Sequence, residues 1–148
     1  MGETKHVIVA LGEELYGIPV LSVETILRDP HPVRMPKSPK MLLGVFELRG
    51  KTLASIDLRL RLELPEHVGD SNHVVVNSPV GPVSLRVDSV VGIASIDEDS
   101  IEPTSSLVNQ ESDEFMSGVA KHNGRLVAIL DPEHIVPAKL KKSIAKVA

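Results

Sequence analysis

The stretch GVFELRGKTLASIDLR, Gly44 to Arg59, is the most informative part of the sequence, because a related stretch, GVAKHNGRLVAILD, follows from Gly118 to Asp131. In each copy two runs rich in β-branched and apolar residues flank a short turn that contains glycine, and Asn123-Gly124 is a strong type I′ turn signal. Each copy predicts a β-hairpin. Six positions match at an offset of 74 residues: Gly44, Val45, Gly50, Lys51, Ala54 and Asp57 recur as Gly118, Val119, Gly124, Arg125, Ala128 and Asp131.

Two more hairpins are predicted on either side of the first copy. HVIVAL and LYGIPV flank the turn at residues 12–14, and HVVVN and PVSLRV flank the turn at residues 78–82. A second offset, of 67 residues, relates Ile18, Val20, Val23 and Ile26 to Leu85, Val87, Val90 and Ile93. Two offsets in the same order indicate two copies of one β-unit. Such units bury their apolar faces and their edges by closing into barrels.

The predicted fold is therefore all-β, with two β-barrels that are related by an internal repeat and meet at an apolar seam. The boundary between them is placed near residues 63–73, and the N-terminal strand is allowed to cross to the second barrel. Short helical segments are expected in SDEFMSG, residues 112–118, and at the C-terminus. There, Ile135, Leu140, Ile144 and Val147 recur at roughly helical spacing, which favours a helix docked on a barrel over one on a membrane surface.

Composition narrows the function classes. The 148 residues include no Cys, no Trp and three other aromatic residues, and the net charge is −4. Residues 63–120 carry eleven acidic side chains against one basic side chain. A nucleic-acid binder needs a basic track and usually stacking aromatics, so that class is disfavoured. The N-terminal apolar run, residues 7–11, is too short for a signal or a membrane span, and a soluble protein is expected.

No pattern of catalytic, metal-binding or cofactor-binding residues stands out. The six histidines, at positions 6, 31, 67, 73, 122 and 134, lack metal-ligand spacing and are expected on the surface or in turns. DEDSIEP, residues 97–103, lacks the glycine and the distal glutamate of an EF-hand and is interpreted as a solvated loop. Asp57 and Asp131 could form an acid–base pair, but their places at strand ends favour capping of backbone N–H groups. We expect a binding protein, not an enzyme, with no metal and no cofactor.

Four segments together resemble the CheW family: YGIPVLSVETILR, GVFELRGKTLASIDLR, VDSVVGI and GVAKHNGRLVAILD. They follow the family's order between about His6 and Val136. The resemblance implies two SH3-like five-stranded β-barrels in a single CheW-like domain. It also implies a non-enzymatic, cytoplasmic adaptor that couples chemoreceptors to the histidine kinase CheA in membrane-associated arrays. The alternatives are a CheW-like scaffold of a non-chemotaxis pathway and a generic SH3-like peptide-binding module.

The resemblance also implies where the partners bind. The cytoplasmic tip of the receptor would dock in an apolar groove between the barrels, and the regulatory domain of CheA would dock barrel to barrel, away from that groove. No kinase-contacting residue is assigned. Carried over position by position, the receptor groove contains Val23, Thr25, Ile26, Gly44, Val45, Leu48 and Arg49.

Three positions in these motifs raise specific expectations. Family members often have Glu where Thr25 stands, and here the acid is Glu24, one place earlier, which in a regular strand points to the opposite face. Ala54 replaces a common Pro and should be nearly neutral. Gly50 can supply the backbone angles of the turn, which leaves Arg49 free to serve binding. The competing interpretation of Arg49 is a solvated turn residue, paired with an acid such as Glu47.

Overall fold

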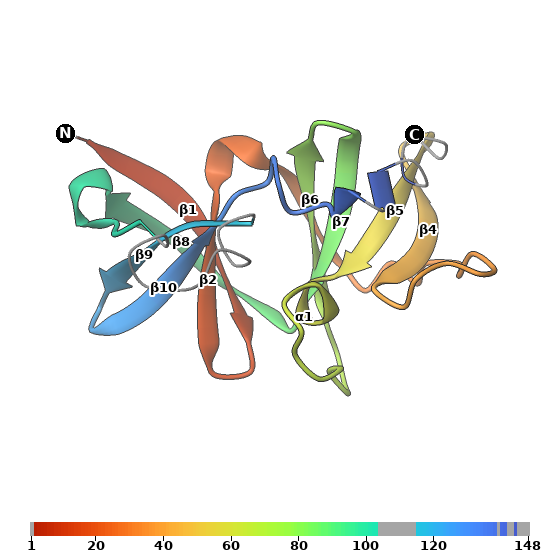
Figure 1. Ribbon diagram of the computed structural model, residues 1–148, viewed down its shortest axis with the longest axis horizontal. Coiled ribbons are helices and arrows are strands. Elements are labelled where there is room, and N and C mark those ends of the chain that lie inside the picture. Colours follow the sequence, from red (N-terminus) through yellow and green to blue (C-terminus); the bar gives the residue numbers. More distant parts are fainter. Residues whose placement is uncertain (1, 104–114, 139, 142–143, 145–148) are drawn as a thin grey trace.

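A computed structural model describes residues 2–103, 115–138, 140, 141 and 144. It contains two five-stranded sheets that stand side by side (Figure 1). The first sheet has the strand order β8-β1-β2-β10-β9. Its strands are β1 (Glu3–Leu11), β2 (Glu14–Pro19), β8 (Ser89–Asp97), β9 (Met116–His122) and β10 (Arg125–Leu130).

The second sheet has the order β3-β6-β7-β5-β4. Its strands are β3 (Val23–Arg28), β4 (Leu42–Leu48), β5 (Lys51–Asp57), β6 (Asn72–Ser78) and β7 (Gly81–Val87). Short helices join the strands: η1 (Val20–Ser22), α1 (Leu58–Arg61) and η2 (Glu98–Ser100). We call the unit built on β3–β7 the first barrel and the unit built on β1, β2 and β8–β10 the second barrel. All four predicted hairpins are confirmed as antiparallel pairs.

The internal repeat is confirmed by the strand pairing. β4 and β5 return as β9 and β10 at the 74-residue offset, and β2 returns as β7 at the 67-residue offset. Even the parallel pairs share one register: Ala54 pairs with Val83 in the first barrel, and Ala128 pairs with Tyr16 in the second. The two sheets therefore have the same topology, although their strands come from the chain in a different order.

The boundary between the barrels differs from the predicted one. β6 and β7 pair with β3 and β5, so residues 72–87 complete the first barrel. The chain changes sheets at Asp88, which is the single residue between β7 and β8. Both β1 and β2 join the second barrel. Residues 62–71 connect α1 to β6 within the first barrel, so they do not separate the two barrels.

The apolar residues form three cores. A small core fills each barrel: Ile8, Val127 and Ile129 belong to the second, and Phe46 and Leu53 to the first. The largest core lies between the sheets. It joins residues of both, including Val7, Val9, Ile18, Val74, Val76 and Leu85. This arrangement confirms the apolar seam, and the alternation of Val7, Ile8 and Val9 between two cores follows from the two faces of a strand.

Gly44 and Gly118 recur because the backbone passes close to each of them. Beyond β3 the chain returns to β4, where Val33 and Val45 exchange two hydrogen bonds, of 2.7 and 2.9 Å. A Cβ atom on Gly44 would lie 2.2 Å from the Val33 carbonyl oxygen, and one on Gly118 would lie 2.7 Å from that of Glu102. Only glycine allows this approach, which draws the edges of each sheet toward each other.

The C-terminal segment crosses from the second barrel to the first (Figure 1). Ile135, Leu140 and Ile144 are buried in the large core between the sheets. Residues 138, 140, 141 and 144 are helical, so the predicted docked C-terminal helix is confirmed for the described residues. Val147 and residues 112–114 of the other predicted helix lie outside them, and Met116 already begins β9.

Candidate functional site: two equivalent pockets on two barrels

The turn between β4 and β5 places Arg49 at an exposed tip. Both turn residues have positive φ angles, 52° at Arg49 and 80° at Gly50. The equivalent turn in the second barrel has 50° at Asn123 and 78° at Gly124. Both turns therefore have the left-handed pair of angles that characterises a type I′ turn, which favours Asn-Gly. The expectation that Gly50 alone supplies the unusual angles is wrong, because Arg49 adopts a left-handed conformation itself.

Arg49 lines a pocket of the first barrel. The pocket has a volume of about 340 Å³. Thr25 from β3 and Leu48 from β4 line it with Arg49, so these three predicted groove residues lie together. The other lining residues are Glu24, Lys51, Leu53 and Pro82. One acid and two bases around an apolar floor can bind a helix surface that carries both charges and apolar side chains.

A β-bulge brings Glu24 into this pocket. Val23 pairs with Val76 and Thr25 pairs with Val75, so Glu24 is an extra residue between two consecutive partners on β6. A bulge re-aims the side chains around it. Glu24 and Thr25 consequently line the same pocket, and the expectation that Glu24 faces away is wrong.

The other predicted groove residues lie on different surfaces of the first barrel. Val23 and Ile26 pair with Val76 and Val74 of the core between the sheets, so they are on the seam-facing side of β3. Ile26 is 41% exposed there. Gly44 is buried and Val45 half-buried, next to the Val33 backbone. The seven residues thus lie on both sides of β3 and do not line a single cavity.

The second barrel has a pocket at the equivalent place, with different chemistry. It has a volume of about 260 Å³, and its lining residues include Val91, Gly92, His122, Asn123 and Arg125. By the two offsets, these positions correspond to Glu24, Thr25, Leu48, Arg49 and Lys51 of the first pocket. The other lining residues are Ile8, Leu15, Ile93 and Ala94. The two equivalent places of the repeat therefore hold one charged pocket and one mainly apolar pocket.

Several apolar side chains of the second barrel are unusually exposed, and two of them line its pocket. Val91 and Ile93 are 61% and 66% exposed on β8, and Leu126 is 69% exposed on β10. From Ser89 to Ile96, β8 carries no charged residue, whereas β3 has Glu24 and Arg28. Val91 and Ile93 lie together in the lining of the second pocket, and exposed apolar side chains that cluster in this way often mark surfaces that bind other proteins.

Each barrel also encloses a histidine, contrary to the prediction that all six lie on the surface or in turns. His6 and His73, related by the 67-residue offset, are 2% and 1% exposed. His73 Nδ1 lies 3.1 Å from the Ser55 hydroxyl and 2.9 Å from the Ser84 hydroxyl. Burial lowers the pKa of His73 to about 4. Burial also lowers the pKa of His6, against a hydrogen bond to the Thr4 carbonyl.

The two repeated aspartates cap the chain after equivalent strands, as predicted. Asp57 Oδ1 accepts from the Arg59 N–H at 2.9 Å, and Asp131 Oδ1 accepts from the Glu133 N–H at 3.0 Å. The backbone N–H of each also donates to a carbonyl, of Met41 and Phe115 respectively. Burial raises the pKa of Asp57, although backbone hydrogen bonds and Arg86 act against the increase. Both carboxylates therefore serve the fold.

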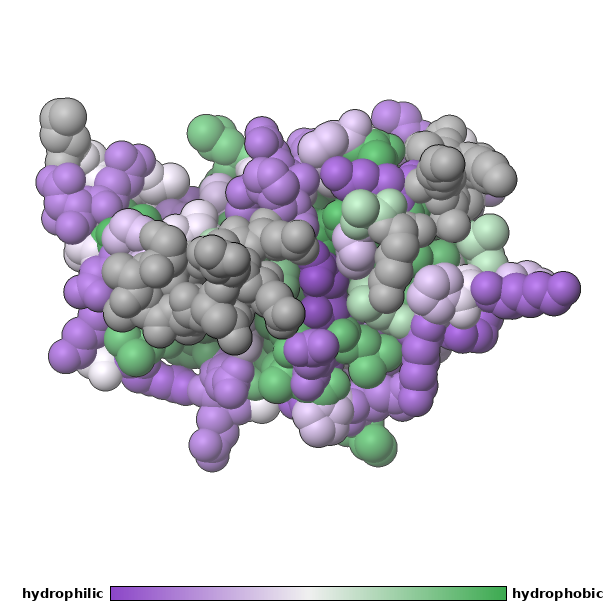
Figure 2. All heavy atoms as spheres, in the orientation of Figure 1, coloured by the Kyte–Doolittle hydropathy of each residue, from purple (hydrophilic) through white to green (hydrophobic). Residues whose placement is uncertain are grey.

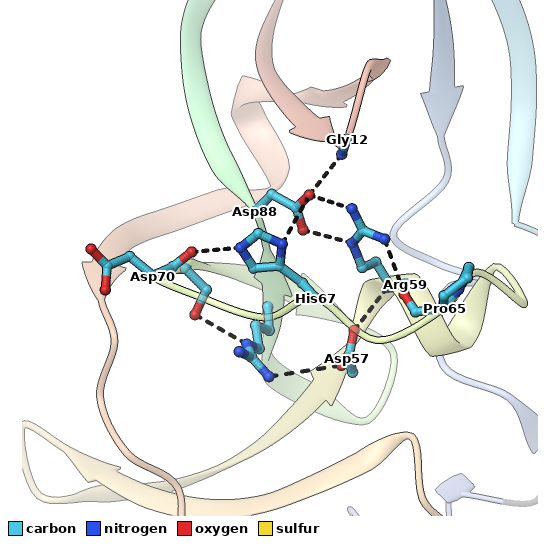
Figure 3. A network of polar contacts seen from close by, with 9 residues as sticks. Gly12, Asp57, Arg59, Pro65, His67, Asp70 and Asp88 are labelled. Atoms are coloured by element: carbon cyan, nitrogen blue, oxygen red, sulfur yellow. Dashed lines mark hydrogen bonds and ion pairs between the residues drawn. The ribbon is translucent and has the colours of Figure 1, made fainter.

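A partly buried polar network joins the barrels (Figure 3). The Asp88 carboxylate accepts two hydrogen bonds from Arg59, at 2.7 and 2.6 Å, and one from the Gly12 N–H at 2.6 Å. His67 Nδ1 lies 3.5 Å from the same carboxylate, and Arg59 also donates to the Pro65 carbonyl at 3.0 Å. This network links the β1–β2 turn of the second barrel to α1 and the 62–71 loop of the first.

Sequence reasoning missed the second pocket, the buried histidines and this network. The 67-residue offset that relates Ile26 to Ile93 also relates His6 to His73 and Glu24 to Val91, so it could have identified the first two. No sequence signal pairs Arg59 with Asp88. Within the described part of the chain, no cluster of three or more His, Asp or Glu residues could hold a metal ion. None of its helices is long and apolar enough to cross a membrane.

Apolar surface is visible near the middle of the molecule, and polar side chains cover most of its outer ends (Figure 2). Residues 5–139 match the family model of the CheW-like domain.

Known proteins of the same kind resemble the chain over most of its length. It is 30% identical to the chemotaxis protein CheW of Helicobacter pylori over 85% of this chain and 77% of that protein. It is 29% identical to the chemotaxis protein CheW of Bacillus subtilis over 96% and 92%. The crystal structure of the scaffolding protein TtCheW from Thermoanaerobacter tengcongensis superposes with a TM-score of 0.83 and 31% identity, covering 91% of this chain and 92% of that one. The chain therefore belongs to the CheW-like family.

Proposed function

We propose that this chain is a non-enzymatic adaptor that couples chemoreceptors to the histidine kinase CheA on the cytoplasmic side of receptor arrays. The observation that carries the proposal is the match to the CheW-like domain across both barrels. The related proteins are named as chemotaxis proteins and as a scaffolding protein, which favours chemotaxis over another pathway. An adaptor needs two separate docking surfaces, and two equivalent pockets of different chemistry supply candidates for them.

The receptor tip is assigned to the first barrel. Its helices would contact the charged pocket with Thr25, Leu48 and Arg49, and the seam-facing side of β3 with Val23 and Ile26. Gly44 and Val45 shape the β4 edge between these surfaces. Such a surface presents a guanidinium fork beside apolar contacts, which suits helices that carry carboxylates or free carbonyls.

The kinase is assigned to the second barrel. Val91 and Ile93 expose apolar side chains in a mainly apolar pocket that Arg125 also lines. Leu126 exposes a further apolar side chain on β10, outside the lining of this pocket. A regulatory domain built from similar barrels would bury this patch, because exposed apolar patches gain most from exclusion of water. The assignment keeps the two partners on different barrels, so both can bind at once.

Ile93→Glu should weaken binding of the CheA regulatory domain about fivefold, roughly 1 kcal/mol, and leave receptor binding unchanged. The physical reason is that a carboxylate would have to be desolvated in an apolar contact. Ile26→Glu is the matched control, because Ile26 occupies the equivalent place in the first barrel. It should weaken receptor binding and preserve kinase binding. Titration by isothermal calorimetry with each purified partner measures both.

The assignment of the receptor to the first barrel and of the kinase to the second is tested by whether each variant loses affinity for one partner only. If Ile93→Glu leaves kinase affinity unaltered in a folded protein, the apolar pocket is not the kinase site. If either variant weakens both partners equally, the two sites are not separate. The adaptor function itself fails if the unaltered protein binds neither the receptor fragment nor the kinase.

A further inference from the structure

The polar network around Asp88 occupies a special place in the chain. Asp88 is the single residue between β7 of the first barrel and β8 of the second, so its backbone is one of the points at which the chain passes between barrels. Its side chain binds Arg59 of the first barrel and the Gly12 N–H of the second. One carboxylate therefore holds both barrels at the point where the chain crosses (Figure 3).

The contacts at this point are directional. Arg61 of α1 also donates hydrogen bonds, to the His134 and Ile135 carbonyls of the segment that follows β10, and most of the remaining contacts between the barrels are apolar. The seam is a hydrophobic core, and burial of apolar surface is not directional. Arg59 instead donates two parallel N–H···O hydrogen bonds to the Asp88 carboxylate, and this pair of bonds fixes the relative orientation of the two groups. The side chains of Arg59 and Asp88 are 16% and 12% exposed, so water screens this contact little.

The turn of the second barrel fits closely over this contact. Gly12 has a φ of 61°, and a Cβ atom there would lie 3.4 Å from Arg59 Nη2. Burial acts to raise the pKa of Asp88, but hydrogen bonds from Arg59 and Gly12 outweigh it and hold the pKa below its usual value. The hydrogen bond to Asp88 raises the pKa of Arg59. Both groups are therefore charged at neutral pH, and each needs the other.

We propose that Asp88 is a positioning residue that sets the angle between the two barrels. The chain can bend at the Asp88 backbone, and the Asp88 carboxylate holds the barrels in one orientation. Without the carboxylate, Arg59 and the Gly12 N–H lose their shared acceptor, while the apolar seam still holds the barrels together. The barrels then remain folded and joined but sample a range of orientations. Because each pocket belongs to a different barrel, the same angle sets the placement of the two pockets relative to each other.

Pulsed electron–electron double resonance, which measures the distance between two spin labels, tests this proposal. The proposal does not depend on the adaptor function. The chain has no cysteine, so spin labels can be placed by Thr52→Cys in β5 of the first barrel and Ser95→Cys in β8 of the second, both exposed. The unaltered background should give one narrow distance distribution. Asp88→Ala should broaden or shift it, whereas a label pair within the first barrel, Thr52→Cys with Asn77→Cys, should not change.

Two further variants serve as a control and as a second way to break the contact between Arg59 and Asp88. Asp97→Ala is the matched control, because Asp97 only caps the η2 turn by accepting from the Asp99 N–H, and it should leave the distribution narrow. Arg59→Lys keeps the positive charge but loses the paired contact, and it replaces Asp88→Ala if that variant does not fold. A distribution between the barrels that stays narrow and unshifted in a folded Asp88→Ala or Arg59→Lys protein would overturn the proposal.

Discussion

Acid should destabilise this protein well above the pH at which most carboxylates titrate, because His73 is buried as the neutral form. In the unfolded chain its pKa is about 6.5, and in the folded protein it is about 4. The folded state therefore binds fewer protons between these values, and stability falls as the pH decreases through this window. Between pH 7 and pH 5 this one residue should cost roughly 2 kcal/mol of the free energy of unfolding. Urea denaturation across that range measures it.

Three other titratable groups with shifted pKa values also contribute to the pH dependence of stability. His6, whose pKa is also lowered, adds to the loss below about pH 6.5. The lowered pKa of Asp88 costs stability only as the pH falls below about 4, and the raised pKa of Asp57 acts in the opposite direction.

Comparison of variants isolates His73. His73→Gln cannot titrate but can still bond the serine hydroxyls, so its stability should fall much less between pH 7 and pH 5. Val75→Ala is the control, because it removes a fully buried apolar side chain from the same strand without changing any charge. Its pH profile should run parallel to that of the unaltered protein. A His73→Gln profile that is also parallel would refute the assignment of this acid sensitivity to His73.

Arg49→Glu should weaken receptor binding by at least about tenfold, or roughly 1.4 kcal/mol, and leave kinase binding intact. The substitution replaces the guanidinium with a carboxylate in a pocket that already contains Glu24, so the receptor would meet two acids. The thermal midpoint should change little, because Arg49 is exposed and its turn angles are no better suited to arginine than to glutamate. Calorimetric titration with a receptor fragment gives the affinity.

The turn geometry provides two controls for this prediction. Arg49→Asn places at this turn the residue that the equivalent turn of the second barrel already has, so it should stabilise the fold slightly and still lose receptor affinity. Asn123→Glu introduces the same charge at the equivalent tip and should leave receptor binding unchanged. Unaltered receptor affinity in folded Arg49→Glu protein would make Arg49 an ordinary solvated turn residue.

The fold was largely predictable from the sequence, because local patterns specify it. Turn residues, alternation and the two offsets gave the four hairpins and the repeat. The barrel boundary was not predictable in this way, since strand exchange between barrels depends on which edges pair, and those contacts are distant in sequence. The sequence of residues 72–87 predicts the same hairpin whether that hairpin begins a second barrel or completes the first.

The candidate site was predictable only in part, for a different reason. Thr25, Leu48 and Arg49 do line one pocket, but the bulge at Glu24 changes which side chains share a face, and a bulge leaves no composition signal here. The burial of His73 depends on Ser55 and Ser84 from two other strands. The paired contact of Arg59 with Asp88 likewise joins residues that are neighbours only after the barrels have assembled.

The most direct test of the adaptor account is co-sedimentation of three purified components: this protein, a membrane-bound receptor cytoplasmic fragment and CheA. We expect that more CheA sediments with the receptor fragment when this protein is present. Arg49→Glu should reduce this increase strongly by weakening the receptor contact, and Ile93→Glu should reduce it less by weakening the kinase contact. Kinase sedimentation that does not increase with this protein, or receptor and kinase that compete for it, would contradict the account.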